Sequence, residues 1–84
     1  MTDTTYNGWK NRQTWNVALY INNEEWLYRK AVAFMKERPN HYAPYASFIK
    51  SMGMQNDRTP DNIKYLSTRL DYSELNEMMR ELVV

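Results

Sequence analysis

Apolar residues recur every three or four positions through most of the chain, and apolar and polar residues nowhere alternate for more than a few positions. That spacing gathers apolar side chains on one face of a helix, whereas a half-buried strand needs strict alternation. The clearest example is the closing segment, where the apolar positions include Leu75, Met78, Met79 and Leu82. Only two glycines and three prolines occur in 84 residues, which disfavours a turn-rich β-sandwich or barrel. The sequence therefore predicts an all-α fold.

Capping residues divide this pattern into a compact bundle of about five short helices. Asn11 can accept a free amide of a first helical turn, and Gly53 suits the position just after a helix end. Thr59-Pro60-Asp61 combines a capping hydroxyl, a proline for the first helical position and an acid. Asp71 precedes Glu74 by three residues, as in a capping box. The predicted helices span about 12–22, 24–38, 42–52, 60–69 and 71–82.

The chain is expected to form one helical domain, residues 9–84, preceded by a flexible arm, residues 1–8. The arm is polar and ends at Gly8, without the basic start and apolar stretch of a secretion signal. No apolar run approaches the roughly 18–20 residues that cross a bilayer, so no membrane partner is expected. The absence of cysteine excludes disulfides and thiolate zinc sites and suits a reducing compartment. We therefore expect a cytoplasmic protein, in the host cytoplasm if it is viral.

The residues that usually carry chemistry are sparse, and we expect neither an enzyme nor a cofactor or metal site. His41 is the only histidine and has no cysteine or paired carboxylate with which to hold zinc. Its nearest candidate partners, Ser47 and Asp57, lie in no recognisable nucleophile motif. Glycine-rich phosphate loops are absent as well. We interpret His41 as a solvated loop residue.

The segment from Gly8 to Asn16 is the densest in residues suited to recognition. It supplies large flat aromatic area, a guanidinium and amide hydrogen-bonding groups, which are common in protein interfaces. The alternative is structural, with Trp15 in the core, Asn11 as a cap and Trp9 closing the bundle. Under the interface hypothesis the contact residues lie on the exposed side of the first helix: Trp9, Lys10, Arg12 and Asn16, with Tyr20 at the margin.

Residues 9–21 read W-K-N-R-Q-T-W-N-V-A-L-Y-I. This string resembles a family of small uncharacterised proteins of tailed phages, including cyanophages, and of cyanobacteria, whose motif is W-K-N-x-x-T-W-N-V-x-L-W-I. Tyr20 stands where tryptophan is common, and it keeps an amphipathic aromatic there. Residues 70–82 are similar to the closing helix of that family. The resemblance implies a viral or virus-associated protein, and it brings no established activity, ligand or catalytic residue.

We therefore expect a non-enzymatic protein-interaction module, a phage accessory protein that engages a host or viral protein. Twelve aromatics and six methionines are difficult to bury in so small a domain, which favours an exposed contact patch. The alternative is a DNA- or RNA-binding protein in which the predicted helices 42–52 and 60–69 act as a helix-turn-helix. A net charge of +1 weakens that alternative, because phosphate contacts dominate such affinity. A third reading is a homo-oligomer without an outside partner.

Overall fold

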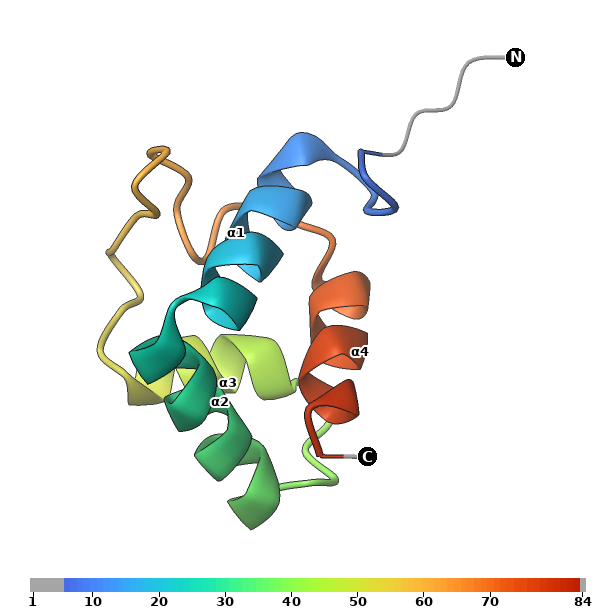
Figure 1. Ribbon diagram of the computed structural model, residues 1–84, viewed down its shortest axis with the longest axis vertical. Coiled ribbons are helices and arrows are strands. Elements are labelled where there is room, and N and C mark those ends of the chain that lie inside the picture. Colours follow the sequence, from blue (N-terminus) through green and yellow to red (C-terminus); the bar gives the residue numbers. More distant parts are fainter. Residues whose placement is uncertain (1–5, 84) are drawn as a thin grey trace.

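The structure is a computed structural model that describes residues 6–83, and four α-helices form its core (Figure 1). They are α1 (Arg12–Asn23), α2 (Glu25–Glu37), α3 (Pro44–Ser51) and α4 (Tyr72–Glu81). Residues 6–83 contain no strand, only isolated bridges that join Tyr6 to Trp9 and Arg58 to Lys64. The all-α class is confirmed, but the described chain has four helices rather than about five. None of these helices combines the length and apolar character that a bilayer crossing demands.

The helices share one core, and a long irregular segment completes the fold. α1 packs on α2 and α4, while α3 packs on α2 and α4. Residues 52–71 then leave α3, pass α1 and enter α4, as the yellow-to-orange trace in Figure 1 shows. An irregular connection of this length is uncommon in a compact domain. Its backbone must therefore be held by specific contacts with the helices.

Buried apolar side chains from every helix form the core. The buried residues of α2 are Leu27, Ala31, Phe34 and Met35, and those of α4 are Leu75, Met78 and Met79. The apolar residues with no exposed area are Val17, Ile21, Ala31, Met35, Tyr45, Phe48, Ile49, Leu75 and Met79. Helical periodicity therefore identified the faces that pack together.

Three of the predicted capping positions are confirmed. The Asn11 side chain accepts a hydrogen bond from the Thr14 amide at 2.9 Å, and Asp71 accepts one from the Glu74 amide at 3.0 Å. Gly53 takes a left-handed conformation, φ +70°, directly after Met52, the C-cap residue of α3. Its amide donates to the Lys50 carbonyl and the next amide donates to the Ile49 carbonyl, which is the Schellman arrangement. The capping residues therefore predicted these helix ends correctly.

The predicted helix over 60–69 is wrong. Its predicted capping residues Thr59 and Asp61 hydrogen-bond Asn16 of α1, and the chain around them forms a tight turn. The Thr59 amide donates to the Ile63 carbonyl at 2.8 Å, and the Ile63 amide donates to the Thr59 hydroxyl at 3.2 Å. Asn62, between them, has a left-handed φ of +69°, which a right-handed helix cannot continue through. The result is a tight turn closed by the bridge between Arg58 and Lys64. Tertiary contacts to α1 have replaced local helix formation here.

The structure describes only residues 6–8 of the predicted arm, residues 1–8. Residues 1–5 lie outside the described residues, so their flexibility stays a prediction. Asn7 and Gly8 have φ values of +49° and +88°, as in a type I′ turn, and Tyr6 and Trp9 exchange two backbone hydrogen bonds of 2.6 and 2.8 Å. The Tyr6 ring also lies 5.0 Å from the Trp15 ring. Residues 6–9 thus form a structured turn that places Trp9 against the helical core.

Buried tyrosine makes the fold sensitive to alkali. Tyr45 has no exposed area and its hydroxyl donates to the Tyr65 carbonyl. Burial, with Tyr72 and Tyr65 nearby, raises the pKa of Tyr45 far above its ordinary value, and burial also raises the pKa of Tyr65. The folded state therefore holds these protons more tightly than the unfolded state does. The stability that these two tyrosines contribute is complete below the unfolded pKa of about 10 and decreases as the pH rises above it.

We predict that the urea concentration at the unfolding midpoint decreases as the pH is raised from 9 to 11.5. In Tyr45→Phe the midpoint should decrease less steeply over the same pH range. Each proton that the folded state retains lowers the free energy of unfolding by about 1.4 kcal/mol per pH unit above the unfolded pKa. Absorbance at 295 nm should show phenolate from Tyr45 only as the protein unfolds. An unchanged slope in Tyr45→Phe would contradict this role for Tyr45.

Candidate functional site

The five residues predicted to form a contact surface are separated by the structure into different environments. Lys10 and Arg12 are exposed, whereas Trp9 and Tyr20 are half-buried. Asn16 has no exposed area, so its predicted place on the exposed side of the first helix is wrong. The predicted surface is therefore not one continuous patch.

Asn16 is buried because its side chain both donates a hydrogen bond to the irregular segment and accepts one from it. Its side-chain amide donates to an Asp61 carboxylate oxygen at 2.6 Å, and its carbonyl accepts from the Thr59 hydroxyl at 2.6 Å. The Tyr20 hydroxyl donates to the same Asp61 oxygen at 3.3 Å. Desolvation at this contact and the neighbouring Asp61 charge raise the pKa of Tyr20. Asn16 and Tyr20 thus hydrogen-bond residues 59–61 of the same chain.

Two further polar residues of α1 and its cap hold the other end of the same segment. The Asn11 side-chain amide donates to the Arg69 carbonyl at 2.7 Å. The Thr14 hydroxyl donates to the Asn11 side chain at 2.7 Å and accepts from the Asp71 amide at 2.9 Å. We call Asn11, Thr14 and Asn16 the polar cluster of α1. Its contacts fix the path of the long connection between α3 and α4.

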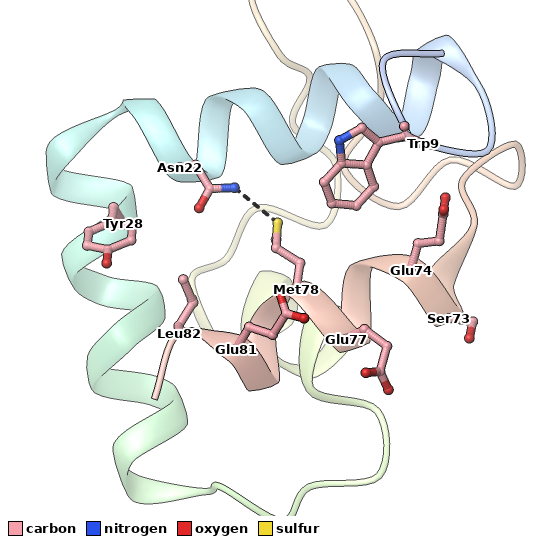
Figure 2. Close-up of a pocket in the computed structure, with 10 residues that line it drawn as sticks. Trp9, Asn22, Tyr28, Ser73, Glu74, Glu77, Met78, Glu81 and Leu82 are labelled. Carbon is pink, nitrogen blue, oxygen red and sulfur yellow. Dashed lines mark hydrogen bonds between the residues drawn. The ribbon is translucent and has the colours of Figure 1, made fainter. Parts of the chain in front are cut away.

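An open groove of about 600 Å³ is lined by Trp9 (Figure 2). The Trp9 indole reaches into it between α1 and α4, and Tyr28 of α2 stands at the far end. Met78 lies between them on α4, with its sulfur accepting a hydrogen bond of 3.2 Å from the Asn22 side-chain amide. Of the predicted site residues, Trp9 alone lines this groove. Its tryptophan, tyrosine and methionine provide apolar contact area.

The α4 side of the groove is acidic. Glu74, Glu77 and Glu81 all line it, and no lysine or arginine does so among the described residues. Glu74 accepts a hydrogen bond from the Lys10 amide at 2.7 Å, which ties α4 to the turn that carries Trp9. Glu77 forms an exposed ion pair with Arg80, with 3.1 Å between nitrogen and oxygen. The groove therefore concentrates negative charge in a chain of net charge +1.

Sequence reasoning missed the α4 side of this groove, although the pattern was present. Residues 74, 77 and 81 follow one another by three and four positions, which places them on one helix face. Charged residues at that spacing more often form a solvated outer face. Only the fold shows that this face stands beside Trp9 and Tyr28, whose positions depend on α1 and α2.

His41 and Ser47 lie close together in an arrangement that resembles a catalytic dyad. The histidine is half-buried rather than solvated, and its Nε2 lies 3.0 Å from the Ser47 hydroxyl oxygen. Its Nδ1 accepts a hydrogen bond of 3.0 Å from the Ala43 amide, so the neutral ring carries its proton on Nε2. In that tautomer Nε2 donates a hydrogen bond to the Ser47 hydroxyl oxygen, which holds the His41 ring against α3. The pair fixes the entry to α3.

The described residues hold no group of three histidine, cysteine, aspartate or glutamate side chains placed to bind a metal ion. Together with the groove, the fold defines a small helical domain with an aromatic and acidic surface site. The chain belongs to the family of unknown function DUF7249, whose model matches residues 2–84. It has no significant match among curated proteins or among solved structures.

Proposed function

We propose that the protein is a non-enzymatic protein-interaction module whose contact surface is the groove beside Trp9. The observation that carries the proposal is the half-buried Trp9 side chain in an open groove of about 600 Å³. A tryptophan that is anchored on one side and accessible on the other is typical of residues that contribute most to interface affinity. Lys10 and Arg12 are exposed close to Trp9 in the chain and extend the contact surface.

The resemblance of residues 9–21 to proteins of tailed phages supports a more specific role. We propose that the chain is a phage accessory protein that binds a host or viral protein in the host cytoplasm. Its mechanism is to cover or remodel a surface of that partner. Nucleic-acid binding was the alternative, and it depended on a helix over 60–69 that the chain does not form. We therefore favour a protein partner.

Affinity capture from host lysate at about 0.15 M salt tests this proposal. We expect the wild type to retain a protein partner in stoichiometric amount and Trp9→Ala to lose it at least about tenfold, as for the truncation of a central interface residue. Trp26→Ala is the matched control, since Trp26 is 55% exposed on α2 and does not line the groove. Arg12→Ala, at an exposed position, should weaken capture without affecting folding.

Helicity and Tm of each variant establish first that it is folded. Because Trp9 packs against the core, Trp9→Phe provides a milder change if Trp9→Ala is unstable. Equal capture by folded Trp9 and Trp26 variants would overturn the proposal. Recovery of nucleic acid in place of protein would restore the alternative, and concentration-dependent mass without a partner would indicate a homo-oligomer.

A further inference from the structure

The chemistry of the groove identifies the kind of partner segment that fits it. Its apolar contacts come from Trp9, Met78 and Leu82, and its charge comes from Glu74, Glu77 and Glu81. Met78 and the C-cap residue Leu82 directly follow Glu77 and Glu81, so an apolar row lies next to an acidic row along α4. A ligand that matches both stripes is amphipathic, with one apolar row and one basic row.

We propose that the groove binds an amphipathic helix of the partner protein, with lysine or arginine side chains on Glu74, Glu77 and Glu81 and apolar side chains between Trp9 and Leu82. This inference rests on the proposed function and adds the chemistry of the partner. Among the described residues, no basic side chain lines the groove to neutralise it from within. The charge complementarity therefore has to come from the ligand.

The spacing of the carboxylates favours a helix over an extended segment. Glu74 and Glu81 are seven positions apart on α4, which corresponds to about 10 Å along the helix axis. Basic residues at i, i+3 and i+7 of a partner helix repeat over the same length and bring three charges to three carboxylates. In a strand, side chains on one face recur every 6–7 Å, so only two would fall within that span.

The carboxylates are available for such contacts at low cost. The Glu77 side chain is 67% exposed in its ion pair with Arg80, and an exposed pair of this kind contributes only about 0–1 kcal/mol. Glu81 is exposed and forms no ion pair with the other described residues. Glu74 uses one oxygen for the Lys10 amide, and its other oxygen accepts no hydrogen bond from the described residues.

A synthetic helix provides the test. The probe is an alanine-based peptide with lysine at i, i+3 and i+7 and leucine at i+4 and i+8, held helical by a covalent side-chain staple. The comparison peptide carries glutamate in place of each lysine. Binding is measured by fluorescence anisotropy on wild type, on Glu77→Gln/Glu81→Gln, and on Glu25→Gln/Glu37→Gln. The last variant makes the same charge change on α2, outside the groove.

We expect the basic peptide to bind the wild type and the Glu77/Glu81 variant to bind at least about fivefold more weakly, as two partly screened charge pairs would give. The Glu25/Glu37 variant should stay within about twofold, and the acidic peptide should not bind. Absence of saturable binding, equal affinity for both peptides or equal effects of the two variants would each overturn the basic helix. If Trp9-dependent capture from lysate persists in that case, the proposed function stands while this inference fails.

Discussion

Replacing Asn16 with alanine is expected to lower the free energy of unfolding by about 2–4 kcal/mol. The side chain is fully buried and makes two hydrogen bonds of 2.6 Å, one of them to the Asp61 carboxylate. A neutral hydrogen bond contributes about 0.5–1.5 kcal/mol and one to a charged group about 1.5–3 kcal/mol. A domain of this size has roughly 4–13 kcal/mol of total stability, so the loss is a large share of it.

Urea and thermal unfolding measure this loss, and Tm should fall by roughly 10–25 °C. Asn23→Ala is the matched control, because Asn23 is exposed in the last turn of the same helix. A surface change of that kind stays within about 0.5 kcal/mol. Equal effects of the two substitutions would mean that the contacts of Asn16 with residues 59–61 contribute nothing to folding.

Thr14→Val is the second substitution with a large expected effect, and it should lower the free energy of unfolding by about 1–3 kcal/mol. Valine keeps the shape of the buried threonine but removes the hydroxyl that accepts from the Asp71 amide and donates to Asn11. The half-buried Asp71 amide is then left without its partner at the start of α4. Chemical denaturation gives the loss of stability directly.

Thr68→Val makes the same chemical change at an exposed position of the irregular segment. It should alter stability by no more than about 0.5 kcal/mol. If Thr14→Val were equally mild, the Thr14 hydroxyl would have no structural role and only its methyl group would matter for packing.

These two substitutions show how the residues of the 9–21 segment divide between folding and contact. The polar cluster Asn11, Thr14 and Asn16 serves the fold, since each member bonds residues 59–71. Trp9 lines the groove, whereas no member of the polar cluster does. A short string dense in tryptophan, asparagine and threonine thus combines a structural role with the proposed binding role.

Local rules predicted the four helices from their periodicity, and they predicted the start of α1, the end of α3 and the start of α4 because adjacent residues set those ends. Asn11, Gly53 and Asp71 cap or stop helices through neighbours within four positions. Helical periodicity likewise identified the buried face of α4. Residues 60–69 satisfied the same rules and still failed, because Thr59 and Asp61 bond Asn16, more than forty positions away. No local pattern in the sequence contains that contact.

The candidate site was predictable only in part for the same reason. The prominence of Trp9 was visible in the sequence, and it does line the groove. The burial of Asn16 was not predictable, because an asparagine on a helix is usually solvated and its hydrogen-bond partners come from a distant segment. Tyr28 and the glutamates of α4 join Trp9 only after α1, α2 and α4 have packed together.

Native-state hydrogen exchange on the wild type and Asn16→Ala tests most directly whether the polar cluster of α1 holds the irregular segment. In the wild type, the amides of Thr59, Asn62 and Tyr65 donate to backbone carbonyls within that segment and should be protected. In Asn16→Ala these amides should exchange through local opening, while those of the α1–α2 core still require global unfolding. Unchanged protection at residues 59–65 in the variant would contradict the role assigned to Asn16.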